Sequence, residues 1–252
     1  QLMQRKAEIG SLKFTREYLC VPISTGTALF NPEYVALCKN KDYVLKLGNR
    51  KQKGYKYYVG VDPAISTDGD YNVITVLEVD ENLNKTVVHV DRAKNIEFRE
   101  NIDKIRLIGQ IFEPEEILFE TNTFAKAFTQ ELRNISDLNI RDFNTTRKKK
   151  QEIILNLQMN IENRKIILPY GNEASRRVTN MLIEELSMFS ITESGKFEGV
   201  GAHDDLVMSL ALANAATQVL GQSFVLLDDL GIFDEPSPTR NHISSGIVGL
   251  NW

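Results

Sequence analysis

The sequence predicts a mixed α/β protein with a five-stranded sheet flanked by helices. The first half of the chain carries short apolar runs rich in β-branched and aromatic residues, and longer runs with helical spacing follow. The order is three strands, then alternating helices and strands, which is typical of a single layered domain. A chain of 252 residues with 42% hydrophobic content can build one sizeable core but scarcely two.

Three strands are expected first. Residues 55–61 form a short apolar and aromatic run, and residues 72–79 alternate in the manner of a strand. Residues 85–90 repeat that pattern after the turn signal at 80–84. Short connections join antiparallel neighbours, so these strands should form a meander.

The spacing of apolar residues then becomes helical over residues 102–112, and Glu113 with Pro114 ends that helix. The later elements are expected as a strand at 117–120, a helix at 124–132, a strand at 140–143, a helix at 149–163, a strand or edge piece at 166–169, a helix at 175–188, a hairpin at 189–200 and a helix at 204–219. This order is that of the ribonuclease H-like fold. A right-handed crossover then places the strand that ends at Glu120 beside the first strand.

The main domain is expected to span residues 55–220. Residues 1–54 read as an N-terminal linker segment and residues 221–252 as a loosely held tail. No run approaches the roughly 18 apolar residues that span a bilayer, so we expect a soluble protein without a membrane partner. The two cysteines, Cys20 and Cys38, are too few for a disulfide framework and lack the spacing of a zinc site.

Three acidic segments stand where apolar runs stop. Asp62 follows the first strand, Glu120 ends the fourth strand, and Asp204 with Asp205 opens the last helix. A carboxylate in such a position is costly to desolvate unless a cation meets it. Because neighbouring strands lie about 4.8 Å apart, Asp62 and Glu120 should face one crevice. The segments together predict a shared divalent-metal site.

The predicted ligands are all oxygen atoms, which favours Mg²⁺ or Mn²⁺ over zinc. In two-metal hydrolysis of a phosphodiester the ions lie about 3.5–4 Å apart, and they activate the attacking water and stabilise the leaving oxygen. We assign Asp62 as the bridging ligand and Glu120 to one of the two ions. Asp204 and Asp205 are assigned to the other ion.

Each of these motifs also has a structural interpretation. Asp62 could simply end its strand in a turn. Glu120 could belong to a polar strand exit in which Thr121 or Asn122 caps the next helix. Asp204 could be an ordinary N-cap. The metal-site hypothesis therefore depends on the conjunction of the three segments.

Two further residues are candidates beside the predicted ions. His203 could orient the attacking water, although a histidine at a helix start is more often structural. Asp70 could reach the site behind the metal ligands, although the sequence around it lacks the further ligands of a calcium loop and reads as a turn.

A basic cluster modifies what the net charge of −4 implies. That charge taken alone argues against a protein that coats nucleic acid. Arg147, Lys148, Lys149 and Lys150 nevertheless follow one another, and beside an acidic metal site such a cluster predicts contacts with DNA phosphates. The alternative is an ordinary solvated surface.

At these residues the chain resembles the C-terminal nuclease domain of the large terminase subunit of tailed bacteriophages. The likeness covers roughly residues 55–217 and is most specific at 61–64, 119–122, 148–150 and 203–210. The resemblance implies a metal-dependent endonuclease that cuts concatemeric viral DNA during genome packaging. It also implies that Asp62, Glu120 and one or both of Asp204 and Asp205 bind the metal ions.

The resemblance further implies double-stranded DNA, a small terminase subunit, a portal ring and a procapsid as partners, and the host cell cytoplasm as the location. Residues 14–19 look like the segment that joins a terminase motor to its nuclease. The chain has no GxxxxGK[ST] phosphate loop, so the packaging ATPase is expected outside it.

Three other functions are compatible with parts of the pattern. A Holliday-junction resolvase or a transposase-like nuclease uses the same acids on a different DNA structure. An actin-like ATPase shares the strand order but needs glycine-rich phosphate turns, which the region near Asp62 does not supply. A non-catalytic DNA-binding module would bind in a salt-sensitive way without metal-dependent cutting.

Overall fold

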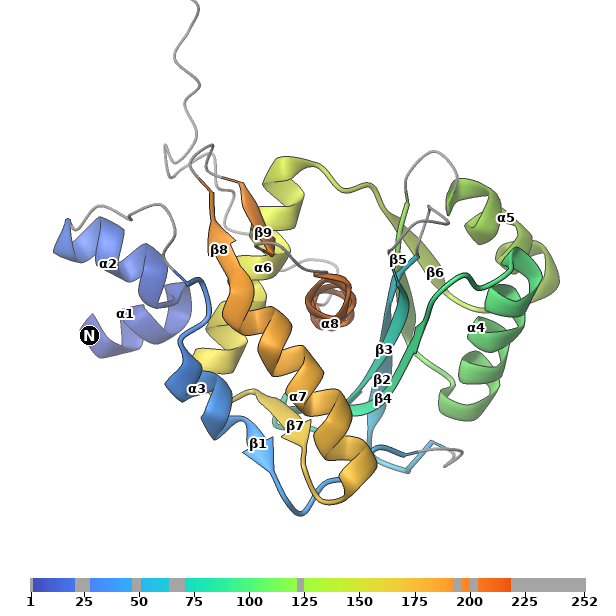
Figure 1. The fold of residues 1–252 in the computed structure, drawn as a ribbon, viewed down its shortest axis with the longest axis horizontal. Helices are drawn as coiled ribbons and strands as arrows, with labels where there is room; N and C mark the ends of the chain where they lie inside the picture. The colour runs from blue at the N-terminus through green and yellow to red at the C-terminus, as the bar shows by residue number, and fades with distance from the viewer. Residues whose placement is uncertain are drawn as a thin grey trace, which may run out of the picture. The chain divides into compact units, whose positions relative to one another are not determined.

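A mixed sheet of seven strands organises the described part of the chain (Figure 1). The computed structural model describes residues 2–20, 28–46, 51–63, 71–121, 125–192, 196–199 and 204–218. The strand order is β1-β7-β4-β3-β2-β5-β6. The strands are β1 (Lys39–Asn40), β2 (Lys56–Asp62), β3 (Asn72–Val79), β4 (Lys85–Ala93), β5 (Glu116–Glu120), β6 (Ile140–Phe143) and β7 (Ile166–Pro169).

The predicted fold class and the five predicted strands are confirmed. Strands β2, β3 and β4 form the expected antiparallel meander, and β5 lies parallel to β2 as the crossover rule requires. The predicted number of five strands is wrong, because β7 pairs with β4 and the two-residue β1 pairs with β7. A two-residue strand is too short to show a periodic pattern, so the sequence could not reveal it.

Helices cover both faces of the sheet (Figure 1). They are α1 (Leu2–Ile9), α2 (Ser11–Leu19), α3 (Pro32–Leu37), α4 (Phe98–Phe112), α5 (Ala125–Ile135), α6 (Arg147–Glu162), α7 (Glu173–Met188) and α8 (Asp205–Ala216). One hydrophobic core lies between the sheet and α4 and α5, and the second lies between the sheet and α6, α7 and α8. Strands β8 (Phe189–Ile191) and β9 (Phe197–Gly199) form the predicted hairpin. None of the described helices is both long and apolar enough to cross a bilayer.

The N-terminal part of the chain contacts the elements that follow it. The amide of Ser11 donates to Glu162 Oε2 at the end of α6 at 2.7 Å, and β1 extends the sheet. The expected boundary between a linker segment and the main domain at residue 54 stays a prediction.

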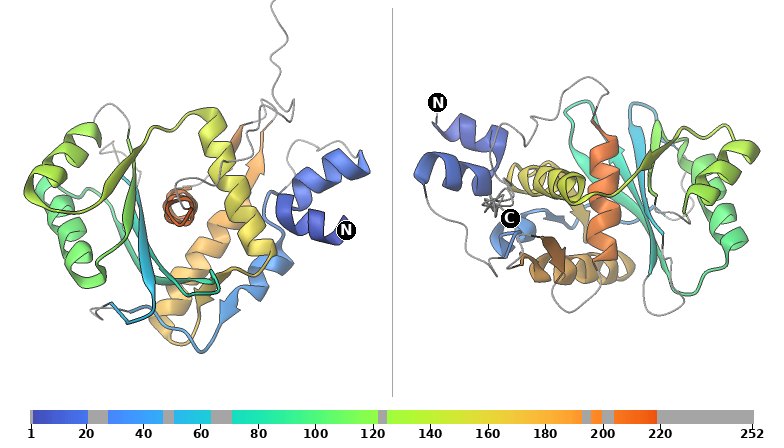
Figure 2. Two further views of the ribbon diagram at one scale, coloured as in Figure 1. Left: turned by 180° about the vertical axis from the view of Figure 1, so that it is seen from behind. Right: turned by 90° about the horizontal axis from the view of Figure 1, so that it is seen from above.

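Helix α8 is buried on every side. It contacts β2, β3 and β5, and it also contacts α6 and α7, so it is enclosed between the sheet and an outer helical layer (Figure 2). A helix with apolar residues around its whole circumference is typical of such an interior position. Gly60 in β2 permits the close approach, because a Cβ atom there would lie 2.1 Å from the carbonyl oxygen of Ser209 and 2.3 Å from the amide nitrogen of Ala213.

A buried lysine occupies the opposite end of this core from the end of β2. Lys85 begins β4 and is 7% exposed, and its Nζ donates to Asn160 Oδ1 at 3.1 Å and to Asn214 Oδ1 at 2.7 Å. Burial lowers the pKa of Lys85 from its ordinary 10.5 to about 8. Both of these acceptors are neutral amide oxygens.

We expect the lysine to make stability depend on pH in the alkaline range. Above pH 8 the folded chain loses the proton that the unfolded chain keeps up to about pH 10.5, so the contribution of Lys85 to the free energy of unfolding rises through that window. A shift of this size corresponds to about 3 kcal/mol. Urea unfolding measures the free energy of unfolding of the wild type and of Lys85→Met at both pH values. Relative to Lys85→Met, the wild type should gain this amount between pH 7.5 and pH 10.5. A pH-independent difference would contradict the prediction.

Candidate active site

Asp62 and Glu120 lie at the ends of neighbouring parallel strands. The register pairs Val61 of β2 with Phe119 of β5, so the two acids come next at the same edge of the sheet. Both side chains are partly buried. The structure brings these two predicted residues together at one edge of the sheet, and their role as metal ligands stays a prediction.

Two more carboxylates act on this pair. Asp205 is the first residue of α8 and is 9% exposed, and Asp204 precedes it. Burial raises the pKa of Asp62 well above its ordinary value, and the negative charges of Glu120, Asp205 and Asp204 raise it further. The structure thus brings the other three predicted acids close enough to Asp62 to act on its charge.

Each aspartate of α8 has a contact of its own. Lys150 Nζ in α6 donates to Asp204 Oδ2 at 2.8 Å, and both side chains are about three-quarters buried. The amide of Tyr71 donates to Asp205 Oδ2 at 3.2 Å. The sequence assigned Lys150 to DNA and Asp204 to metal, and it did not reveal that they pair.

The donor set suits a hard divalent cation. It consists of carboxylate oxygens, which such a cation prefers as ligands. The neighbouring negative charges that help to raise the pKa of Asp62 would be neutralised by a dication. In the described residues no group of three or more His, Cys, Asp or Glu side chains is already arranged around a common point where an ion could sit. The four acids therefore fit such a metal in chemistry. In this structure Asp204 contacts Lys150, and Asp205 contacts the amide of Tyr71.

The other predicted site residues have separate positions. Asp70, His203 and Asn122 lie outside the described residues. Thr121 does not cap α5 in the described structure, because its buried hydroxyl has no hydrogen-bond partner there. Asp204 occupies the N-cap position of α8 but makes no capping bond with its side chain.

The predicted basic cluster forms the first turn of α6. Thr146 caps this helix, and its Oγ1 accepts from the amide of Lys149 at 3.3 Å. Arg147 and Lys150 also line a pocket of about 120 Å³ together with Lys196 and Glu198 of the β8–β9 hairpin region. Lys196 was missed by the sequence analysis, since a single lysine in a hairpin carries no pattern.

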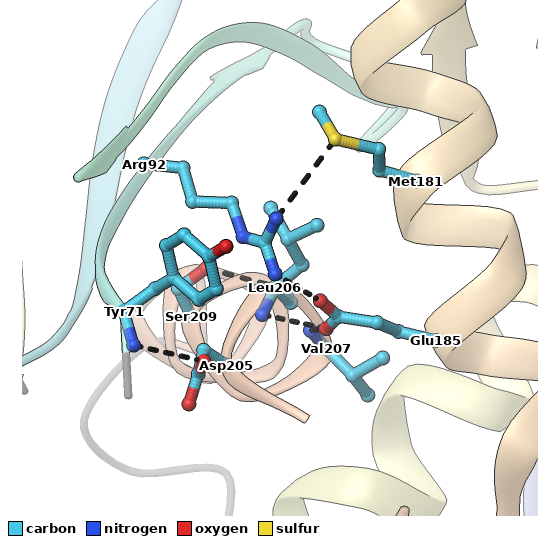
Figure 3. Close-up of polar contacts among 8 residues, drawn as sticks. All are labelled: Tyr71, Arg92, Met181, Glu185, Asp205, Leu206, Val207 and Ser209. Atoms are coloured by element: carbon cyan, nitrogen blue, oxygen red, sulfur yellow. Dashed lines mark hydrogen bonds and ion pairs between the residues drawn. The ribbon is translucent and has the colours of Figure 1, made fainter. Parts of the chain in front are cut away.

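A further charged group supports the start of α8. Glu185 of α7 accepts from the amides of Leu206 and Val207, and Arg92 of β4 lies against its other oxygen (Figure 3). Burial raises the pKa of Glu185 to about 7, against the opposing effects of these amides and Arg92. The sequence offered no signal for Glu185, which stands among the polar residues of an amphipathic helix.

Comparisons with known proteins agree with this architecture. A family model described as the terminase RNaseH-like domain matches residues 59–216. No curated protein matches the chain. The ribonuclease H-like fold predicted from the order of the strands and helices is thereby confirmed.

Solved terminase structures are similar at low sequence identity. The large terminase nuclease from thermophilic phage G20c is 19% identical, with a TM-score of 0.60 over 76% of this chain and 99% of that chain. The same nuclease with bound magnesium is 19% identical, with a TM-score of 0.59 over 77% and 98%. The HK97 bacteriophage large terminase is 12% identical, with a TM-score of 0.54 over 85% of this chain and 49% of that chain. At these identities the likeness concerns the fold.

Proposed function

We propose that this chain, which belongs to the terminase RNaseH-like domain family, is a divalent-metal-dependent endonuclease that cuts concatemeric viral DNA during genome packaging. The observation that carries the proposal is the placement of Asp62 and Glu120 at the same edge of the neighbouring parallel strands β2 and β5, with Asp204 and Asp205 at the start of helix α8, which packs on both strands. The magnesium-bound nuclease of phage G20c has the same fold and supports the choice of ion.

Asp62, Glu120, Asp204 and Asp205 would hold two Mg²⁺ or Mn²⁺ ions. Bound there, the ions would supply a water nucleophile at neutral pH and positive charge beside the scissile phosphate. In the metal-free chain Lys150 partly neutralises Asp204 at 2.8 Å.

The partners follow from the same proposal. Double-stranded DNA is the substrate, and the first turn of α6 supplies cations to its backbone. A small terminase subunit, a portal ring and a procapsid complete the proposed packaging assembly, and the host cell cytoplasm is the proposed location.

The proposal is tested by incubating the purified chain with supercoiled plasmid and Mn²⁺ or Mg²⁺, with a chelator in a parallel reaction. We expect metal-dependent conversion to relaxed and linear DNA and none with chelator. A four-way junction offered beside linear duplex distinguishes the terminase activity from that of a resolvase, because a resolvase would cut the junction selectively. Metal-independent binding without any cutting would reject the nuclease.

Removing Lys148 and Lys149 from the basic cluster should weaken DNA binding and its dependence on salt. Each phosphate contact contributes about 0.9 to the slope of log affinity against log salt, so Lys148→Ala with Lys149→Ala should flatten the slope by about 2. Lys150→Ala should change it less in the absence of metal, because Asp204 already pairs with Lys150. Fluorescence anisotropy with labelled duplex measures the slope.

The matched control is Arg176→Ala with Arg177→Ala, which removes two adjacent cations from the first turns of another helix, α7. We expect its salt slope to equal that of the wild type. If the two double variants behave alike, the start of α6 has no special part in DNA binding.

A further inference from the structure

The first turn of α8 takes its capping acceptor from another helix. An aspartate at the N-cap usually adopts extended backbone angles and accepts from the amides two or three residues on. Asp204 instead has φ −116° and ψ 14° and makes no such bond. Glu185 Oε2 takes its place, accepting from the amide of Leu206 at 2.8 Å and of Val207 at 3.4 Å (Figure 3).

The other carboxylate oxygen of Glu185 is held by Arg92. Arg92 Nη2 lies 3.3 Å from Glu185 Oε1, and the glutamate side chain is only 8% exposed. The guanidinium of Arg92 lies 3.5 Å from the ring centroid of Tyr71, and its Nη1 is 3.9 Å from Met181 Sδ. An acceptor buried beside one cation and two backbone donors has little freedom to move.

This arrangement leaves both aspartates of α8 available to the candidate active site. Asp204, released from capping, points its carboxylate to Lys150. Asp205 accepts a hydrogen bond from the amide of Tyr71, and the guanidinium of Arg92 lies over the ring of the same tyrosine (Figure 3). Tyr71 therefore contacts both the arginine that holds the cap and one of the acids.

We propose that Glu185 is a positioning residue: by capping α8 in place of Asp204, it keeps the carboxylate of Asp204 away from the open amides of its own helix and available, beside Asp205, to the proposed metal site. This inference rests on the proposed function for the identity of the site. Without the acceptor of Glu185, Asp204 turns to the open amides of its own helix and is lost to the metal.

The test compares two variants that differ only in the capping acceptor. In Arg92→Met/Glu185→Gln an amide oxygen remains for the first turn of α8, and no unpaired charge is buried. In Arg92→Met/Glu185→Met the acceptor is gone while the side-chain volume is similar. Isothermal titration with Mn²⁺ should give a dissociation constant at least about tenfold higher for the second variant, the size typical of a lost supporting contact. Equal dissociation constants would overturn the proposal.

A metal-free measurement tests the same claim without relying on activity. Asp204→Ala is added to each variant, and the thermal midpoint is recorded in chelator. In the variant with Glu185→Met, Asp204 is expected to cap α8 itself. Asp204→Ala should therefore lower the thermal midpoint of that variant by roughly 2–4 °C more than it lowers the midpoint of the variant with Glu185→Gln. Equal shifts would overturn the proposal.

Different results would reject the proposed nuclease function and the proposed capping role of Glu185. An absence of plasmid cleavage by the wild type rejects the proposed nuclease. The capping role is rejected only by the matched pair, through equal Mn²⁺ affinities or equal thermal shifts.

Discussion

Asp62→Asn is expected to lower metal-dependent plasmid cleavage by at least about a thousandfold, because loss of a central ligand removes several kcal/mol of charge stabilisation at the scissile phosphate. The fold should survive. Burial raises the pKa of Asp62, and the charges of Glu120, Asp205 and Asp204 raise it further, so its charge opposes folding in the metal-free chain as pH rises through that pKa. The thermal midpoint in chelator should therefore be equal to or above that of the wild type.

A second measurement separates metal binding from general damage. Mn²⁺ should raise the thermal midpoint of the wild type and have little effect on Asp62→Asn, because a ligand stabilises only the folded state that binds it. Asp103→Asn is the matched control, since Asp103 is 63% exposed and pairs with Arg106 on α4. Its cleavage rate should remain within about twofold of wild type. Loss of secondary structure in Asp62→Asn would falsify the assignment of Asp62 as a ligand.

Gly60→Ala is expected to destabilise the fold by at least about 3 kcal/mol, through overpacking that rotamer changes cannot relieve. The added Cβ would lie 2.1 Å from Ser209 O and 2.3 Å from Ala213 N, and both atoms belong to the backbone of α8. The helix must therefore move as a unit. Because Asp205 begins this helix, cleavage should fall with stability, and urea unfolding measures the change directly.

Gly109→Ala provides the matched control. A Cβ there would also be close to another atom, at 2.5 Å, but that atom is a terminal methyl carbon of Leu138. A side-chain end can rotate away, and alanine is favoured over glycine within a helix by about 1 kcal/mol. We expect Gly109→Ala to be near neutral. If both variants lose similar stability, the close approach of α8 to β2 is not what makes Gly60 necessary.

The sequence was sufficient to predict the central part of the fold. Strands β2 to β6 and the hairpin have local patterns of alternation or apolar clustering, and chain handedness then fixes which strands are neighbours. Strand β7 was expected only as a strand or edge piece, and it meets β4 at only two register positions. Strand β1 has two residues and no comparable signal.

The candidate site, like the fold, has a part that the sequence predicts and a part that it does not. The positions of Asp62 and Glu120 follow from where two apolar runs end, and their meeting follows from strand order. The contacts of the helix acids do not follow from any local pattern, because Lys150 is 54 residues from Asp204 and Tyr71 is 134 residues from Asp205.

By itself, the sequence determined which acids are available, at which ends of strands and helices they stand, and which strands bring Asp62 beside Glu120. The tertiary structure alone decided that Glu185 caps α8, that Asp204 pairs with Lys150 and that Gly60 admits the helix. The reason is physical: periodicity reports which face of an element is buried, whereas these contacts depend on how side chains of separate layers pack against one another.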